Sequence, residues 1–528
     1  MSTPTRRRAG FPDQALPAPP TDEEKYWYMG RQHRWLLLVQ ALSFALIAWS
    51  IARFATADTR LLLFLLPMSL YTVTLVVSLA SNSRTKRVSR LDHELRLLEY
   101  RPERYPDVDV FLPTAGEPIE VLRNTYTHVS RLEWPGGLRV LVLDDGVRAE
   151  VRDLARGFGF DYRTRDNPGR LKKAGNLRFG YENSDGELIA IFDADFVPRP
   201  DYLFELVPYT DDPDVGIVQS PQFFDTGRGM HWFRRCAGAT QELFYRWIQP
   251  ARDRSRAAIC VGTCALYRRA ALVASGGFAQ IGHSEDVHTG VNMMKAGFHV
   301  RYVPILVSKG LCPDTLGGFL NQQYRWCTGA MSLLATPSFH AAERISFRQR
   351  ACFWSGFLYY ISTALNAFVA PLPALTMLYL LPAWIEPMNS IWLVGALCMW
   401  FVVLPLLMKG RWRVDVLRVQ LLYSYAHAVA IAHLVTGRTK EWVATGSSAG
   451  RATPVAVTVN RIVKVYVGVT QLLIYVGLAV GTATYGFAAY WAMIGLAVLG
   501  AYVHLPLLVM PLTRTVREAP VASGPVAA

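Results

Sequence analysis

The sequence has few of the features that mark a secreted or a zinc-binding protein. Its seven cysteines include no CxxC pair, and none stands with histidine at a spacing that suits zinc. An odd number of cysteines, most of them outside the longest apolar runs, argues for reduced thiols. The N-terminus is rich in proline and polar residues and lacks the apolar core of a removable signal peptide. We therefore expect residues 1–30 to form a disordered cytosolic N-terminus.

Charge is also scarce, because only 18% of the residues are charged while 51% are hydrophobic. This composition is typical of a membrane protein with a soluble insert. A net charge of +14 is compatible with nucleic-acid binding, but the basic clusters at residues 6–8, 84–90 and 409–413 stand beside apolar segments. Such clusters are typical of the cytoplasmic ends of membrane helices. We expect contact with membrane lipid and no nucleic-acid partner.

Two apolar runs, at residues 35–54 and 61–80, each have the length of about 20 residues that crosses a bilayer. They predict a transmembrane hairpin at residues 31–82. Basic residues on the outer side of each run place both outer ends, and the segment that follows, in the cytoplasm. The sequence thus predicts a multi-pass protein of the plasma membrane with a cytoplasmic domain.

A second membrane domain is predicted at residues 350–510, with about four spans and a cytosolic tail at 511–528. The first span contains Pro371 and Pro373, so it is either one kinked helix or a broken one. Residues 414–434 mix polar side chains with leucine and valine at helical spacing, which favours an amphipathic helix in the membrane interface.

Between the two membrane segments, short apolar runs alternate with polar helical stretches. This pattern predicts a mostly parallel α/β sheet within a soluble domain at residues 100–345. Open sheets of this kind bind ligands at the carboxyl ends of their strands. The candidate strands are residues 108–112, 138–143, 188–192, 215–218 and 259–265.

Polar side chains follow several of these strands. Asp193 and Asp195 stand two residues apart, so in extended backbone both reach one side and can hold a single hard cation. Alone, this pair is also compatible with an acidic turn. Asp144 and Asp145 end another strand, and the loop that begins at Thr114 is suited to a base and a ribose.

Three further groups complete this predicted rim. Glu117 lies in the first loop, and Lys173 is suited to meet a phosphate or a sugar. Asp286, with Glu285 before it, either caps a helix or accepts the proton of an attacking hydroxyl. A metal site at the neighbouring His283 and His288 is the less favoured interpretation.

The stretch at residues 322–329 combines an amide, a guanidinium and an indole just before the membrane domain. The guanidinium of Arg325 can pair with a pyrophosphate, and the indole of Trp326 offers a flat apolar face to a pyranose ring. We hypothesise that this stretch holds the growing end of a polysaccharide.

These motifs together resemble the D, DxD, (T/S)ED and QxxRW signature of processive family 2 glycosyltransferases, which include cellulose, chitin and hyaluronan synthases. The resemblance is carried by residues 144–145, 193–195, 284–286 and 322–326, and it extends to residues 173–176, 220–224, 262–263 and 268–269. It implies a GT-A-type, Rossmann-like cytosolic glycosyltransferase domain inserted in a polytopic α-helical membrane domain, similar to the cellulose synthases.

The resemblance also implies roles for the candidate residues. Asp286 is the expected catalytic base, with Glu285 beside it, and Asp193 and Asp195 are the expected ligands of Mg²⁺ or Mn²⁺. Trp326 and Gly262 are expected to bind the acceptor. The residues expected to bind the nucleotide sugar are Thr114, Glu117, Asp144, Asp145, Lys173, Asp193, Gln322 and Arg325.

A loop at residues 438–452 stands where cellulose synthases place a mobile loop over the nucleotide. Its match to their pattern is loose, so Trp442 and Thr445 are either gating residues or interfacial anchors. No soluble domain of the kind that reads cyclic di-GMP is expected after the last span.

The sequence thus predicts a membrane-embedded, processive, inverting glycosyltransferase. The favoured reaction extends a β-1,4-glucan from UDP-glucose and translocates the growing polysaccharide across the membrane, with or without accessory export proteins. One alternative is a non-processive transferase that adds a single sugar to a lipid or cell-wall acceptor. An alternative of another class is an inactive transport or assembly partner.

Overall fold

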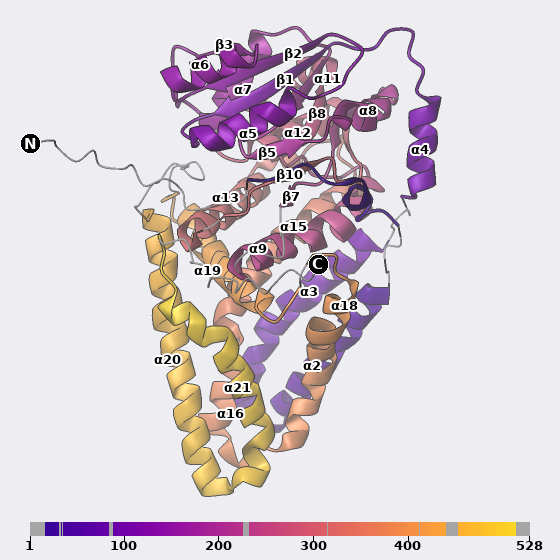
Figure 1. The fold of residues 1–528 in the computed structure, drawn as a ribbon. Helices are drawn as coiled ribbons and strands as arrows, with labels where there is room; N and C mark the ends of the chain where they lie inside the picture. The colour runs from indigo at the N-terminus through magenta and orange to yellow at the C-terminus, as the bar shows by residue number, and fades with distance from the viewer. Residues whose placement is uncertain are drawn as a thin grey trace, which may run out of the picture.

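The structure is a computed structural model that describes residues 16–30, 33, 35–83, 88–224, 232–313, 315–410, 412–439 and 452–513. An α/β domain lies at one end of a bundle of long helices, and helices α9 (Trp232–Leu243), α13 (Leu316–Leu334) and α19 (Val416–Val435) lie between the two (Figure 1). The N-terminal and C-terminal long helices thus share one bundle, although the whole α/β domain separates them in sequence.

A seven-stranded sheet in the order β3-β2-β1-β4-β8-β6-β9 forms the centre of the α/β domain. All neighbouring strands are parallel except that β8 runs antiparallel to β4 and β6. This arrangement confirms the predicted GT-A-type fold. The strands are β1 (Val108–Thr114), β2 (Leu138–Asp144), β3 (Asp161–Arg163), β4 (Leu188–Ile191), β6 (Val215–Gln219), β8 (Ala265–Arg268) and β9 (His299–Tyr302).

Helices cover both faces of this sheet, and each face carries its own apolar core. A small second sheet in the order β5-β10-β7 lies toward the long helices. The remaining elements of this domain are α5 (Ile119–Val129), α6 (Ala149–Gly157), α7 (Lys172–Glu182), β5 (Phe196–Pro198), α8 (Tyr202–Leu206), β7 (Phe223–Phe224), α9 (Trp232–Leu243), α10 (Gln249–Asp253), α11 (Arg269–Ser275), α12 (Glu285–Ala296) and β10 (Ser308–Gly310).

The predicted strand at residues 259–265 is wrong for all but its last residue. Residues 259–264 form a loop, in which Gly262 and Cys264 have φ values of +76° and +52°. Such left-handed backbone cannot continue a strand. The apolar run Ile259–Val261 resembles a buried strand because the loop is packed inside the domain, and β8 begins only at Ala265.

The predicted disorder of residues 1–30 is also wrong for its last part, because residues 16–30 pack on the α/β domain. Lys25 is buried and pairs with Asp201 at 3.0 Å and with Glu205. Its carbonyl accepts a hydrogen bond of 2.9 Å from the amide of Leu306. A proline-rich, polar composition indicates disorder only when its charges lack partners, and here the folded domain supplies them.

Within the ranges that the structure describes, six helical segments are long and apolar enough to cross a membrane, which matches the six predicted runs. Two precede the α/β domain and four follow it. They comprise α2 (Trp35–Ala57), α3 (Leu65–Asn82), α15 (Phe347–Val369) with α16 (Leu372–Leu380), the segment Pro387–Leu407, α20 (Pro454–Tyr485) and α21 (Phe487–Val509). Ala370 and Pro371, between α15 and α16, keep right-handed helical backbone, so Phe347–Leu380 is one segment whose hydrogen bonding is interrupted at the prolines. Of the two predicted forms, this favours the kinked helix.

Two helices join the α/β domain to the long helices. These are α13 (Leu316–Leu334), which carries residues 322–329, and α19 (Val416–Val435), which matches the predicted interfacial helix. α19 packs against α9, α13, α15 and α20, and many of its side chains are buried. It is therefore a core element of the junction rather than a helix with one protein-covered face.

Candidate active site

A cavity of about 1520 Å³ begins at the carboxyl ends of β1, β2 and β4 and continues between the long helices. Most of the residues that sequence motifs predicted lie along its wall. These are Thr114, Glu117, Asp145, Lys173, Asp193, Asp195, Glu285, Asp286, Gln322, Arg325 and Trp326. Trp442 and Thr445 lie outside the residues that the structure describes.

Asp144 lies behind this wall rather than on it. Its carboxylate accepts hydrogen bonds from the amides of Gly146 and Arg148, at 2.9 and 2.8 Å, and from the Tyr162 hydroxyl at 3.0 Å. These bonds hold the turn after β2. Asp144 thus positions this turn, while Asp145 faces the cavity, and the nucleotide contact of Asp144 stays a prediction.

Asp145 is held by an arginine that the sequence analysis missed. The guanidinium of Arg165 donates to both carboxylate oxygens of Asp145, each at 2.6 Å. The same guanidinium donates to the carbonyls of Arg170 and Lys172. Because this bidentate pair fixes both groups, Asp145 has one orientation before any ligand arrives.

Lys173 and Asp193 form an ion pair on the opposite side of the cavity mouth. The Lys173 ammonium lies 2.5 Å from Asp193 Oδ1 and 2.8 Å from the carbonyl of Gly262. The amide of Asp193 donates to Thr263 Oγ1 at 2.9 Å. Lys173 thus brings a positive charge to the first carboxylate of the DxD motif.

Asp195 has a different electrostatic environment. Burial raises its pKa to about 7, and the charges of Asp193 and Glu117 act in the same direction. The two carboxylates of the DxD motif and Glu117 therefore repel one another across a shared space. A divalent cation in that space relieves the repulsion, since hard cations prefer carboxylate oxygens.

No group of three or more histidine, cysteine, aspartate or glutamate side chains gathers at metal-binding distance within the described ranges. A cation at Asp195 therefore needs further oxygen ligands from a bound substrate. The alternative site at the two histidines gains no support, because within the described residues they belong to no such group and His288 Nε2 lies 3.1 Å from the Ser332 hydroxyl.

α12 begins directly after Ser284, whose φ of +52° is left-handed, and Asp286 is the second residue of this helix. Burial raises the pKa of Asp286 to about 7, and the neighbouring charge of Glu285 adds to the effect. A Cβ atom on Gly262 would lie 2.9 Å from Asp286 Oδ2. Gly262, predicted to bind an acceptor, therefore leaves room for this carboxylate and does not itself line the cavity.

α13 presents Gln322, Arg325 and Trp326 to the cavity, because residues three and four apart share one helix face. The opposite face is buried, and Tyr324 Oη there lies 3.0 Å from His433 Nδ1. Burial lowers the pKa of Arg325, while the charges of nearby carboxylates, Asp193 first among them, act to raise it. The guanidinium is thus placed at the acidic rim.

The same helix touches the Asp286 turn directly. A Cβ atom on Gly329 would lie only 1.6 Å from the Ser284 hydroxyl and 2.3 Å from Ser284 Cβ. No side chain fits in that space without movement of α13 or of the turn. Gly329 therefore couples the position of Trp326, one turn earlier on α13, to that of Asp286.

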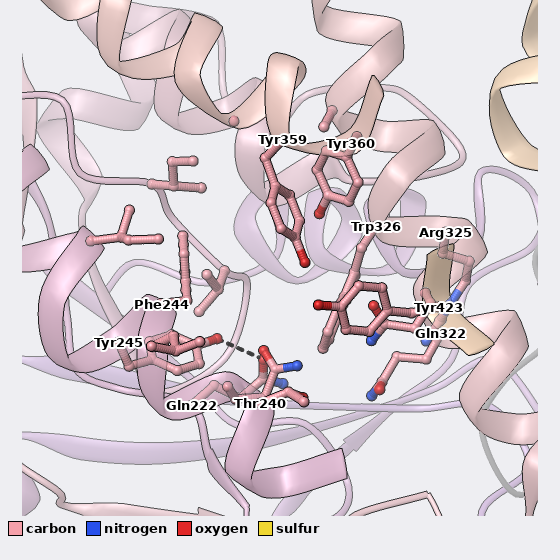
Figure 2. Close-up of a pocket in the computed structure, with 18 of the residues that line it drawn as sticks. Gln222, Thr240, Phe244, Tyr245, Gln322, Arg325, Trp326, Tyr359, Tyr360 and Tyr423 are labelled. Atoms are coloured by element: carbon pink, nitrogen blue, oxygen red, sulfur yellow. Dashed lines mark hydrogen bonds between the residues drawn. The ribbon is translucent and has the colours of Figure 1, made fainter. Parts of the chain in front are cut away.

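Aromatic side chains form the wall below this rim. Figure 2 shows Trp326 beside Tyr359, Tyr360 and Tyr423, with Phe244 and Tyr245 across the cavity and the Tyr245 hydroxyl directed at Gln222. That hydrogen bond measures 3.0 Å. Sequence analysis missed Phe244 and the tyrosines because they come from α15, α19 and the π-helical segment Phe244–Ile248 after α9, and no short motif connects them.

The cavity then continues between the long helices past polar side chains. Those along this part are Ser78 of α3, Ser362 and Asn366 of α15, Gln420 and Ser424 of α19 and His504 of α21. Polar groups inside a set of apolar helices are costly unless they face other polar groups or water. The acidic rim and a polar path among the long helices thus belong to one space.

The mixed sheet, its acidic strand ends and the apolar helices form the arrangement that the resemblance to GT-A-type glycosyltransferases implies. A family model described as glycosyl transferase family group 2 matches residues 188–436, a little under half of the chain. This segment is therefore similar to the glycosyltransferases of that family group.

Curated relatives agree with this assignment. The cellulose synthase catalytic subunit [UDP-forming] of Pseudomonas fluorescens is 34% identical over 269 residues, which cover 50% of this chain and 36% of that protein. The protein of the same name from Xanthomonas axonopodis pv. citri is 31% identical. That match covers 48% of this chain and 36% of the relative. The match thus spans about a third of the length of these relatives.

Among solved structures, a mannosyltransferase from Pyrobaculum calidifontis, in complex with GDP-Man and Mn²⁺, aligns with a TM-score of 0.42 at 17% identity. The alignment covers 68% of this chain and 98% of the mannosyltransferase chain. Glucosyl-3-phosphoglycerate synthase from Mycobacterium tuberculosis aligns with a TM-score of 0.30 at 19% identity, with 40% and 77% covered.

Proposed function

We propose that this protein is a processive, inverting glycosyltransferase that extends a β-linked polysaccharide from a UDP-sugar and passes it through a membrane. The observation that carries this proposal is the single cavity that joins the acidic strand ends to the space among the long helices. UDP-glucose and a β-1,4-glucan are the favoured donor and product, because relatives that match half of the chain are UDP-forming cellulose synthases.

In this proposal, the terminal hydroxyl of the acceptor attacks the anomeric carbon of the donor and gives its proton to Asp286. The bond between that carbon and the diphosphate oxygen breaks, and UDP leaves with the bonding electrons. The single displacement inverts the anomeric centre. The raised pKa of Asp286 suits a base that must take a proton and later release it near neutral pH.

The donor would lie between Thr114, Asp145 and Lys173, with its diphosphate toward Arg325. Asp195, with Asp193, would hold Mg²⁺ or Mn²⁺, and the bound cation would neutralise charge on the departing diphosphate. The mutual repulsion of these carboxylates fits such an ion. We place the catalytic domain in the cytoplasm, where UDP-sugars are made, in line with the basic flanks of the first two apolar helices.

Linkage analysis tests the reaction. Purified full-length protein in lipid nanodiscs, supplied with labelled UDP-glucose and Mn²⁺ or Mg²⁺, should yield a polymer with 1,4-linked glucose that an endo-β-1,4-glucanase digests. UDP-N-acetylglucosamine is the matched control donor. Polymer from that donor alone would change the sugar, whereas the absence of polymer from every nucleotide sugar would refute the proposal.

Trp326→Ala is expected to shorten the product several-fold while single additions continue. Stacking of an aromatic ring is worth about 0.5–1.5 kcal/mol beyond its burial, so its loss speeds acceptor release between additions. Gel filtration of labelled product gives the length distribution, and Trp326→Phe, which keeps a ring, is the matched control. Unchanged product length in Trp326→Ala would favour the transferase that adds one sugar to a lipid or wall acceptor.

Gly329→Ala is expected to lower kcat by at least about tenfold, with little change in the KM for the donor, because the new methyl group displaces the Asp286 turn. Ser284→Gly removes both atoms that the methyl group meets, so the double variant should recover most of the lost kcat. A Gly329→Ala enzyme with normal kcat, or a double variant without recovery, would contradict this coupling.

The rate at saturating donor and metal should rise as pH increases from about 6 to 8, with a midpoint near the Asp286 pKa of about 7. The sign follows because only the deprotonated carboxylate accepts a proton. Saturating metal keeps Asp195 ionised, so its own titration does not add to the profile. Initial rates of UDP release across this range measure the midpoint, and a flat profile would exclude Asp286 as the titrating base.

A further inference from the structure

Arg252 is a buried arginine that the reaction does not use. It belongs to α10, lines the cavity where α3 and α15 meet the α/β domain, and is 2% exposed. One guanidinium nitrogen, Nη2, lies 3.3 Å from the Ser355 hydroxyl. Its Nε and Nη1 atoms are buried and have no hydrogen-bond partner among the described residues. The guanidinium thus offers two unused donors.

No negative charge compensates Arg252 within the described part of the chain. Burial lowers its pKa, and the only groups that act to raise it are Cys352 and Tyr360. Arg165, by contrast, is buried with a bidentate carboxylate partner. A buried guanidinium without an acceptor is strongly destabilising. The site beside Arg252 therefore fits a ligand that carries acceptor oxygens and negative charge.

A second side chain with an unused donor reaches the same cavity. The indole Nε1 of Trp247, in the turn that leads into α10, is buried and without a hydrogen-bond partner among the described residues. An indole N–H only donates, so it has the same requirement as the guanidinium. Two side chains from one short segment thus need an acceptor-rich ligand.

The position of the site indicates where such a ligand comes from. Ser81, in the last turn of α3, donates to the carbonyl of Ala351 in α15 at 3.1 Å, so the ends of two membrane-sized helices meet beside Arg252. The same cavity has apolar walls formed by Leu36, Phe44 and Leu75 of α2 and α3. A cavity with a charged end and apolar walls suits an amphiphilic ligand. Basic pockets between membrane helices bind lipid headgroups.

We propose that Arg252 and Trp247 bind a phosphate group, supplied by a membrane phospholipid whose chains lie along α2 and α3 or by free phosphate. The second N–H of Nη2 can act together with the N–H of Nε or of Nη1 to give two parallel hydrogen bonds to one phosphate, and the indole N–H is a further donor in the same cavity. This site is separate from the proposed donor site, because none of the carboxylates at the acidic rim contributes to the charge environment of Arg252. It does not depend on the sugar that the enzyme transfers.

Native mass spectrometry of the full-length protein tests this proposal. The purified protein is first stripped of lipid in a neutral detergent. It is then reconstituted in nanodiscs of either phosphatidylglycerol or the phosphate-free digalactosyldiacylglycerol, and it is released from the nanodiscs in the mass spectrometer. The wild type should retain one phosphatidylglycerol and no galactolipid. Arg252→Gln should retain about tenfold less, since a charge-assisted hydrogen bond is worth about 1.5–3 kcal/mol. Arg256→Gln, an exposed arginine of the same region, is the matched control and should behave as wild type.

Two further measurements keep the test decisive. Trp247→Phe keeps the ring and removes the donor, so it should weaken retention even if Arg252→Gln fails to fold. A thermal shift with inorganic phosphate in detergent distinguishes the sources: stabilisation by free phosphate without retention of phosphatidylglycerol assigns the site to a soluble phosphate. Equal retention of both lipids by wild type and Arg252→Gln, or binding of a neutral cello-oligosaccharide at Arg252 in place of phosphate, would overturn the proposal.

Discussion

Asp286→Asn is expected to reduce sugar transfer by about 10²–10⁴-fold, the usual contribution of a general base. The substitution keeps the size of the side chain and removes its ability to accept the acceptor proton. Donor affinity should stay the same, because Lys173, Asp193 and Arg325 are unchanged. Rates of UDP release and titration of UDP binding by calorimetry measure the two effects separately.

A control substitution at another carboxylate distinguishes the loss of activity in Asp286→Asn from a general effect of removing a negative charge. Asp185 is exposed and pairs with Arg139 far from the acidic rim, so Asp185→Asn should transfer sugar at the wild-type rate. If Asp286→Asn kept more than about a tenth of the wild-type rate, a loss far below that expected of a general base, the proposed base would be wrong.

Asp195→Ala is expected to lower the rate by about 10²–10³-fold, because the loss of a metal-held charge on the leaving diphosphate is worth several kcal/mol. UDP binding to the wild type should tighten when Mn²⁺ is added, and this effect should disappear in the variant. The wild-type enzyme should lose its activity in a chelator and regain it with Mn²⁺ or Mg²⁺.

Removal of this carboxylate also relieves the repulsion around it, since burial and the charges of Asp193 and Glu117 raise its pKa. Asp195→Ala should therefore be no less stable to unfolding than wild type in the absence of metal. Activity that persists in the chelator, or Asp195→Ala protein that still responds to Mn²⁺, would show that the cation lies elsewhere.

The positions of motifs at strand ends were predictable from sequence, because a strand in a sheet determines where the residue that follows it lies. Asp145, Asp193 and Thr114 lie at neighbouring strand ends of the sheet, as the alternation of apolar and polar stretches predicted. The same logic failed at Ile259–Val261, where an apolar segment is buried as a loop. Burial explains the composition of such a segment, but the left-handed φ of Gly262 ends the strand pattern.

Contacts between distant elements were beyond the reach of the sequence. Arg165 meets Asp145 because β3 pairs in parallel with β2 and places Arg163 opposite Leu143, so that the residues two positions further along lie side by side. The three-residue strand β3 was not among the predicted strands, so this pairing could not be foreseen. Tyr360 and Tyr423 face the cavity because of how α15 and α19 are rotated, which packing decides. The hydrogen bonds by which Asp144 holds the turn after β2 could likewise not be foreseen from its motif.

The α13 helix is where predicted and unpredicted features meet. Its Trp326 and Arg325 were expected at the site, whereas Gly329 was not expected to touch Ser284. The contact links the helix that carries Trp326 to the turn that carries Asp286.

Proteoliposomes test most directly whether synthesis and passage share one cavity. Full-length protein is reconstituted and supplied with labelled UDP-glucose and Mn²⁺ outside, and molecules with an outward-facing α/β domain are the only ones that reach the donor. Polymer should accumulate inside, protected from added endo-β-1,4-glucanase until detergent opens the vesicles, and Asp286→Asn should make none. Labelled product that stays outside and digestible, or that extracts with lipid as single-sugar adducts, would contradict the account.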